Sequence, residues 1–181
     1  MRIIAGKAKG RKLKSINNPE VRPTSDRVKE AIFNMLGPVI RNCVILDLFA
    51  GFGSLGLEAL SRGAKRAIFV EKSKKNSSVI NENLNLCNFS EYGIVKNNDV
   101  FDYLSKVKNK FDIIFMDPPY DQGLVKESLV NILDNNTVFS DSLIVAELSR
   151  EVDIELPPGL ITIKHKIYGD TKVEFYRQEE N

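Results

Sequence analysis

The glycine-rich segment after the apolar run Val44–Leu48 constrains the fold more than any other feature of this chain. Glycines stand at positions 51, 53 and 56, and a helical pattern of apolar residues follows them. This spacing lets the backbone turn tightly from a buried strand into a helix and approach a ligand closely. Glu71 closes the next apolar run, about 20 residues further on, where a carboxylate can bind ribose hydroxyls. The segment predicts a βαβ unit with a nucleotide-like ligand at its turn.

Asp47 distinguishes between the ligands that such a turn can bind. The glycine pattern alone fits NAD, FAD or S-adenosylmethionine. A carboxylate four residues before the first glycine would point toward the turn, where it would repel a pyrophosphate and attract an ammonium group. The methionine end of S-adenosylmethionine carries an ammonium group, so Asp47 favours that cofactor. The competing interpretation is a strand-end aspartate that only caps local N–H groups.

Strands and helices alternate through the middle of the chain. Strands are predicted at residues 43–48, 67–71, 93–96, 111–116 and 142–147, and helices at 54–62, 73–86, 100–106 and 122–134. This rhythm predicts right-handed βαβ units and a parallel sheet. Residues 161–167 and 172–177 predict two further strands around a turn, with no helix between them. An α/β fold whose mostly parallel sheet ends in an antiparallel hairpin is typical of class I, Rossmann-like methyltransferases that use S-adenosylmethionine, and not of dinucleotide-binding dehydrogenases.

A further helix is predicted before the alternating region. Thr24 or Ser25 can cap its first turn, and Gly37-Pro38 stops it. Its apolar face is expected to contain Val28, Ala31, Ile32, Met35 and Leu36.

The four residues Asp117-Pro118-Pro119-Tyr120 follow the apolar run 111–116, where a buried strand ends. The prolines have a fixed φ angle, so the segment is stiff and aims a backbone carbonyl. The Asp117 carboxylate, the Pro118 carbonyl and the Tyr120 ring suit a planar group with an exocyclic NH₂, which is a nucleobase. The alternative is an ordinary proline-rich turn. Gly51, Glu71, Asp99 and Asp117 all follow predicted strands, and ligands of open α/β sheets bind at that edge.

Positive charge is concentrated at the amino end of the chain. Residues 1–29 carry a net charge of +7, which leaves −5 for the other 152 residues. A basic arm on a mildly acidic body is typical of binding to a phosphate backbone, although a solvated tail has the same composition. We expect residues 1–20 to form a basic arm or hairpin around Gly6 and Gly10, and residues 21–181 to form the main domain. The candidate contacts to RNA phosphates are Lys7, Lys9, Arg11, Lys12 and Arg22.

Composition excludes several other classes. An apolar fraction of 43% over 181 residues is ordinary for a soluble domain, and no apolar run approaches the roughly 20 residues that span a bilayer. Cys43 and Cys87 lack zinc spacing, so we expect buried or half-buried thiols in a reducing cytoplasm and no metal site. His165, the only histidine, lies in an alternating pattern and is expected to be a strand residue. The sequence therefore argues against a Ser-His-Asp or zinc hydrolase, and nothing in it demands a dimer.

Taken together, the motifs resemble those of the RsmD family. The resemblance rests on Arg22-Pro23-Thr24, Asp47-Leu48-Phe49-Ala50-Gly51, Glu71 and Asp117-Pro118-Pro119-Tyr120, and it covers nearly the whole chain. Members of that family methylate the exocyclic N2 amine of one guanine in bacterial 16S ribosomal RNA, so the resemblance implies S-adenosylmethionine as cofactor and the small ribosomal subunit as partner. Phe52 departs from the family pattern, in which a small or hydroxylated residue is expected.

The resemblance also implies a role for each site residue. The target amine would contact Asp117 and Pro118, and the target base would stack on Tyr120. The methionine part of the cofactor would lie on Asp47 and on the backbone of Phe49, Ala50, Gly51 and Gly53. Its ribose would bind Glu71, its adenine amine would bind Asp99, and its adenine ring would lie between Lys72 and Val100.

Four other functions compete with this one. An adenine-N6 methyltransferase acting on DNA or RNA shares the Asp-Pro-Pro-Tyr element and is the nearest. A glutamine-N5 protein methyltransferase is expected to have Asn in place of Asp117. An NAD(P)-dependent oxidoreductase would use the same glycines but conflicts with Asp47. A non-catalytic RNA-binding module would leave residues 117–120 unexplained.

Overall fold

The computed structural model describes residues 1–16, 25–119 and 123–179. Seven strands form one sheet in the order β3-β2-β1-β4-β5-β7-β6. Their bounds are β1 Val44–Leu48, β2 Arg66–Glu71, β3 Gly93–Asn97, β4 Phe111–Met116, β5 Val138–Ser149, β6 Leu160–Tyr168 and β7 Thr171–Gln178. β1 to β5 pair in parallel, whereas β7 pairs antiparallel with both β5 and β6. This topology confirms the predicted α/β fold with a terminal antiparallel hairpin.

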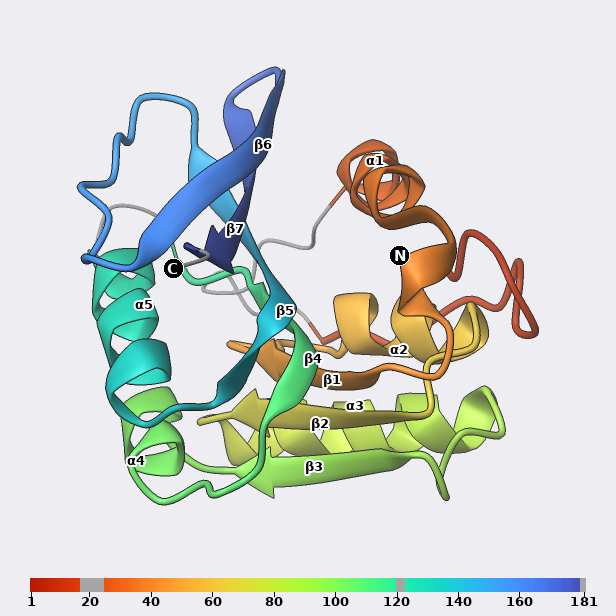
Figure 1. Cartoon of the computed structure of the whole chain (residues 1–181). Coiled ribbons are helices and arrows are strands. Elements are labelled where there is room, and N and C mark those ends of the chain that lie inside the picture. The colour runs from red at the N-terminus through yellow and green to blue at the C-terminus, as the bar shows by residue number, and fades with distance from the viewer. Residues whose placement is uncertain (17–24, 120–122, 180–181) are drawn as a thin grey trace.

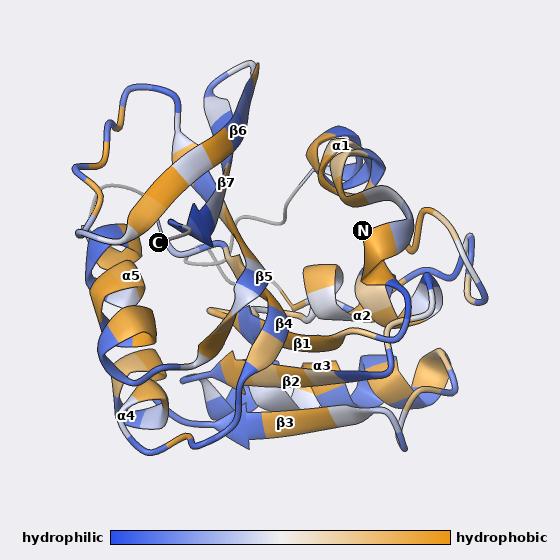
Figure 2. Cartoon of the chain, in the orientation of Figure 1, coloured by the Kyte–Doolittle hydropathy of each residue, from blue (hydrophilic) through white to orange (hydrophobic). Residues whose placement is uncertain are grey.

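Helices cover both faces of the sheet and give the molecule three layers (Figure 1). α1 (Asp26–Leu36), α2 (Ser54–Ser61) and α3 (Lys74–Leu86) contribute apolar side chains to the core on one face. α4 (Val100–Leu104) and α5 (Leu124–Asp134) contribute to the core on the other face. The short 3₁₀ helix η1 (Gly37–Ile40) follows α1. Figure 2 shows that hydrophobic residues dominate β1 and β2, as expected for strands that helices cover on both sides.

The predicted apolar face of α1 is partly wrong. Ser25 caps the helix through its side-chain oxygen, which accepts a hydrogen bond from the Val28 N–H, so the start was predicted correctly. Lys29 and Phe33 are buried, whereas Ala31 and Met35 are only half-buried. The buried face of α1 is therefore rotated so that it includes Phe33, whose ring lies 5.6 Å from that of Phe115 on β4. A large aromatic side chain buries more apolar area than alanine, and this contact decides the orientation.

Strand β5 is longer than the predicted 142–147. It begins at Val138, opposite Phe111 of β4, and the register then shifts before Ile113 pairs with Leu143. The Ser142 hydroxyl donates to the Phe111 carbonyl at 2.7 Å and accepts from the Phe139 N–H at 2.8 Å. The Ser142 hydroxyl thus replaces backbone hydrogen bonds where the register shifts. An alternating pattern of apolar residues does not indicate such a shift.

The first 13 residues fold back on themselves. Arg2 and Lys12 form an antiparallel bridge, the Ile3 N–H donates to the Arg11 carbonyl at 3.0 Å, and the Gly10 N–H donates to the Ile3 carbonyl at 2.9 Å. Ile3 and Leu13 are buried in the same core as α1 and α2. The predicted boundary at residue 20 lies outside the described residues, so the division into arm and main domain stays a prediction.

Several smaller expectations are also met. Cys43 is half-buried and Cys87 is buried, and both are free thiols. His165 lies on β6 opposite Glu174 of β7, as a strand residue. Within the described ranges, no helix has both the length and the apolar character required to cross a membrane.

Candidate active site

The turn between β1 and α2 has the predicted geometry. Phe49, Gly51 and Gly53 have φ angles of 57°, 56° and 82°, in the left-handed region that glycine adopts without steric cost. The Gly53 N–H donates to the Ala50 carbonyl at 2.7 Å, and the Ala50 N–H donates to the Val70 carbonyl of β2 at 3.0 Å. The turn is therefore tight and is held against the neighbouring strand.

Gly56 allows α2 to approach the sheet. A Cβ atom at this position would lie 2.3 Å from the Phe69 ring of β2 and 3.0 Å from the Asp47 carboxylate. The Gly56 N–H instead donates to Asp47 Oδ2 at 2.8 Å. The third glycine of the motif thus serves close packing of helix on strand, as in other glycine-rich βα turns.

Asp47 is buried, with only 2% of its surface exposed. Burial raises the pKa of its carboxyl group to about 8, and the nearby charge of Glu71 adds to this rise, while the hydrogen bond from Gly56 opposes it. The bond to Gly56 shows that the local capping interpretation describes part of its role. A buried carboxylate without a cation is costly, so the position suits a ligand that brings an ammonium group.

Glu71 already accepts three hydrogen bonds within the protein. Its Oε2 atom accepts from the Gly51 N–H at 2.9 Å, and its Oε1 atom accepts from the Ser73 N–H at 2.8 Å and from the Asn76 amide at 3.3 Å. These bonds fix the glycine turn relative to the start of α3. A carboxylate has about four acceptor lone pairs, so a ribose hydroxyl can share an oxygen that already accepts one bond.

Phe52 is buried, with 3% exposure, so its aromatic ring is packed inside the protein. Its carbonyl accepts from the Asn83 amide at 3.1 Å. The same amide group pairs with Lys14, accepting from its N–H at 2.7 Å and donating to its carbonyl at 3.1 Å. Asn83 therefore connects the glycine turn to the amino-terminal segment, a link that the sequence did not indicate.

The predicted adenine-binding residues lie at the ends of β2 and β3. Asp99 is exposed and caps α4, accepting from the Phe101 N–H at 2.8 Å. Val100 is buried in the core beneath α4, and Lys72 is exposed after β2. All three follow strands whose carboxyl ends meet at one edge of the sheet, in the part of the fold where such ligands bind.

The Asp117-Pro118 segment follows β4 at the same edge. The last residue of β4, Met116, pairs with Leu48 on one side and with Ala146 of β5 on the other. Asp117 is half-buried and Pro118 is buried. The structure thus brings this segment next to the glycine turn, on an adjacent strand. The third predicted residue of the group, Tyr120, lies outside the described residues.

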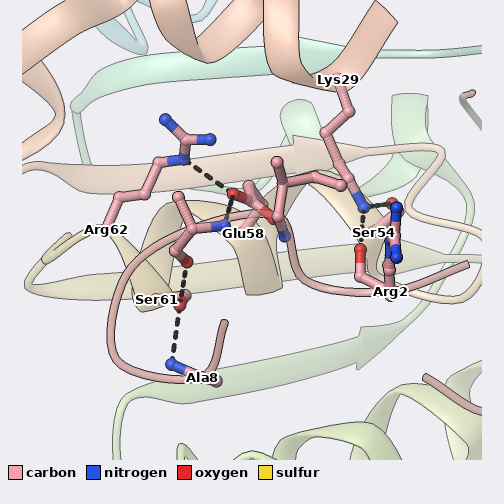
Figure 3. A network of polar contacts seen from close by, with 9 residues as sticks. Arg2, Ala8, Lys29, Ser54, Glu58, Ser61 and Arg62 are labelled. Atoms are coloured by element: carbon pink, nitrogen blue, oxygen red, sulfur yellow. Dashed lines mark hydrogen bonds and ion pairs between the residues drawn. The ribbon is translucent and has the colours of Figure 1, made fainter. Parts of the chain in front are cut away.

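Buried charges attach the amino-terminal hairpin to α2 (Figure 3). Glu58, fully buried, accepts from the Ile4 and Ala5 N–H groups at 2.7 and 3.0 Å and from Arg62 Nε at 2.7 Å. Lys29 Nζ donates to the Arg2 carbonyl at 2.6 Å and to Ser54 Oγ at 3.1 Å. Because Ser54 begins α2 directly after Gly53, this network also supports the glycine turn. Sequence reasoning missed Lys29, although a lysine on the helical stripe of Ile32 and Leu36 was a usable signal.

Burial lowers the pKa of Lys29, and the charges of Glu58 and Asp26 oppose that effect. Glu58 forms its ion pair with Arg62 at 2.7 Å, while Lys29 binds the hairpin through the Arg2 carbonyl. The hairpin is therefore held by hydrogen bonds to buried charged side chains as well as by apolar packing.

The predicted RNA-binding side chains on the hairpin point outward. Lys7, Lys9, Arg11 and Lys12 are exposed, and none of them forms an ion pair within the part of the chain that the structure describes. Neighbouring Lys14, by contrast, pairs with Glu82 at 2.7 Å. The fifth candidate, Arg22, lies outside the described residues.

Several known proteins are similar to this chain along nearly its whole length. The family described as "Conserved hypothetical protein 95" matches residues 1–177. Ribosomal RNA small subunit methyltransferase D of Haemophilus influenzae is 38% identical over 180 residues, covering 98% of this chain and 93% of that protein. Its counterpart in Escherichia coli K12 is 36% identical, covering 99% of this chain and 90% of that protein. The chain belongs to the RsmD family.

This membership confirms the resemblance seen in the sequence. A solved Escherichia coli structure, described as a candidate methyltransferase, has a TM-score of 0.89 and 35% identity, and the match covers 100% of this chain and 99% of that one. The RsmD-family chain therefore has the class I methyltransferase fold that its strand order indicates.

Proposed function

We propose that this RsmD-family protein transfers a methyl group from S-adenosylmethionine to the exocyclic N2 amine of a guanine in 16S ribosomal RNA of the small subunit. The observation that carries the proposal is the placement of Asp117 and Pro118 beside the glycine turn, on the strand adjacent to β1. Relatives that cover nearly the whole chain are named ribosomal RNA small subunit methyltransferase D, which supports the substrate class.

The residues at the sheet edge fit the cofactor. Glycines 51 and 53 form a turn with positive φ angles that a ligand can approach closely, and Asp47 supplies a buried carboxylate for an ammonium group. Glu71 would bind the ribose, while Asp99, Lys72 and Val100 would surround the adenine. When bound, S-adenosylmethionine supplies a methyl group made electrophilic by the positive sulfur.

Asp117 and the Pro118 carbonyl would act on the target amine. The lone pair of a guanine exocyclic nitrogen is delocalised into the ring, which makes the nitrogen a poor nucleophile. Two acceptors can bind its two N–H groups and direct the lone pair toward the methyl group. The Asp117 carboxylate would also stabilise the positive charge that develops on the nitrogen.

The target base has to leave its stack to reach this edge of the sheet. Tyr120 would hold the unstacked guanine by its ring face. The exposed hairpin cations would bind phosphates outside the active site, so that affinity for RNA falls as the salt concentration rises.

Transfer of radiolabelled methyl from S-adenosylmethionine to small ribosomal subunits that lack the modification tests the reaction. Digestion to nucleosides then identifies the product, and Asp117→Ala and Asp134→Ala are compared with the wild type. We expect label in N2-methylguanosine, lost in Asp117→Ala and kept in Asp134→Ala, which removes an exposed carboxylate at the end of α5. Label in N6-methyladenosine, or on DNA alone, would overturn the substrate assignment.

The role of the hairpin is tested separately by salt dependence. Replacing Lys9 and Lys12 by alanine should reduce the slope of log K against log salt by roughly 1.4 to 1.8, because each of the two phosphate contacts contributes roughly 0.7 to 0.9. The control Lys106→Ala/Lys108→Ala removes the same charge from exposed positions between α4 and β4. If log K depends on salt with the same slope in the two variants, the hairpin is not part of the RNA interface.

A further inference from the structure

Glu147 of β5 lies beside Asp117 and has no role in the reaction described above. Met116, the last residue of β4, pairs with Ala146 of β5, so the next residues of the two strands, Asp117 and Glu147, are neighbours across the sheet. β5 continues past the end of β4 because β7 supports it, with Glu147 opposite Val173. The strand thus forms a wall next to the Asp117-Pro118 segment.

Both carboxylates lie on the same face of the sheet. Side chains alternate along a strand, and Phe115 on β4 and Val145 on β5 both belong to the core beneath α1. Two residues further on, Asp117 and Glu147 share that face. Neighbouring strands are about 4.8 Å apart, which is comparable with the width of the hydrogen-bonding edge of one nucleobase.

Glu147 is only 6% exposed, which is unusual for a glutamate at the edge of a ligand site. Glutamates are rarely buried unless they are paired. A carboxylate that contacts another protein group still has acceptor lone pairs left, since it has about four in all. Its position therefore allows it to bind a donor on the same base that Asp117 holds.

We propose that Glu147 accepts the N1–H of the target guanine and so selects guanine over adenine. This rests on the proposed function. The Watson–Crick edge of guanine places the N1–H donor next to the N2 amine, so that one carboxylate can bind each group. Adenine has an unprotonated N1 whose lone pair would face the Glu147 carboxylate. The contact would thus attract the correct base and repel the wrong one.

2-Aminopurine provides the test, because it keeps the amine at position 2 but has no N1–H. Once nucleoside mapping has located the methylated guanine, small-subunit RNA is assembled by ligation with guanine or 2-aminopurine at that position. The ligated RNA is supplied either as naked RNA or as a small ribosomal subunit, according to which of the two the wild-type enzyme methylates. The ratio of kcat/KM for guanine to kcat/KM for 2-aminopurine is measured for the wild type and for Glu147→Gln. Glu151→Gln, at an exposed position just after β5, removes the same charge as a control.

We expect the guanine to 2-aminopurine ratio to fall roughly 10- to 100-fold in Glu147→Gln, the scale of one charged hydrogen bond, and to stay unchanged in Glu151→Gln. The glutamine amide can donate to N1 of 2-aminopurine, so the activity on that base should be maintained. Affinity for S-adenosylhomocysteine, measured without RNA, should not change.

An unchanged ratio in Glu147→Gln would overturn the proposal. If activity on both bases falls by the same factor, Glu147 has only a structural role. Glu147→Asp keeps the charge, and we expect it to retain the preference even if its rate falls. Loss of the preference for guanine over 2-aminopurine in Glu147→Asp would contradict the proposed contact with the N1–H. If the wild type methylates no guanine, the proposed function itself fails, and that result appears before any variant is compared.

Discussion

Replacing Asp47 by asparagine is expected to stabilise the protein and weaken cofactor binding at the same time. Asp47 is almost fully buried, and the Gly56 N–H donates to one of its oxygens. The asparagine carbonyl can accept that same bond in nearly the same shape. The substitution therefore removes the ionisable group and leaves the packing around it in place.

The stability effect follows from the raised pKa of Asp47, about 8 in the folded protein against an ordinary 3.8. Between these two values the folded protein holds a proton that the unfolded chain has lost, so the free energy of unfolding decreases as pH rises through that window. Within that window, each pH unit lowers the free energy of unfolding of the wild type by about 1.4 kcal/mol. The asparagine variant has no such group, and its advantage over the wild type should grow by about 3 kcal/mol between pH 5 and pH 7.5.

Urea denaturation of both proteins across that pH range measures this difference. The two proteins differ only at residue 47, so the difference between the two curves measures the effect of that carboxyl group. Calorimetry with S-adenosylhomocysteine should show roughly 10- to 100-fold weaker binding by the variant, the scale of one charged hydrogen bond. Wild-type affinity should rise with pH up to about 8, because an ammonium group binds the ionised carboxylate. A stability difference that does not change with pH would refute the reasoning.

Three further outcomes are expected. Glu58→Ala should destabilise the protein by roughly 3 to 5 kcal/mol, because it removes one member of a buried charge pair, and hydrogen exchange should show faster exchange at the hairpin amides. Gly56→Ala should lower the melting temperature and cost at least about 1 to 3 kcal/mol, because its Cβ would clash with the Phe69 ring; an unchanged melting temperature would contradict the packing. Burial, together with the charges of Asp112 and Asp141, raises the pKa of the Cys43 thiol to about 11. Iodoacetamide at pH 8 should therefore label it on the order of a hundredfold more slowly than a free thiol.

Buried polar side chains connect the amino-terminal hairpin to the glycine turn. Lys29 contacts the start of α2 through Ser54, and Asn83 binds both the hairpin and the carbonyl of Phe52. The surface proposed to hold RNA phosphates and the turn proposed to hold the cofactor therefore rest on the same buried polar groups. Buried, fully bonded polar networks are rigid, which suits a site that has to position two substrates.

Local sequence patterns determined the order of the elements and the location of the candidate site. Apolar runs, glycines at 51, 53 and 56, and a serine cap at Ser25 each act over a few residues, so their structural effect can be inferred without the rest of the chain. The carboxyl ends of parallel strands then had to meet at one edge, which placed Asp47, Glu71 and Asp117 together.

Only the tertiary structure decided which partners the polar groups would find. Lys29 and Glu58 are far apart in the sequence, and their burial depends on the hairpin closing over α2 (Figure 3). The side of α1 that faces the sheet depended on the packing of Phe33 against Phe115. The position of Glu147 depended on β7 extending β5 beyond the end of β4. These contacts join residues distant along the chain, and their stability comes from burial, which no local pattern encodes.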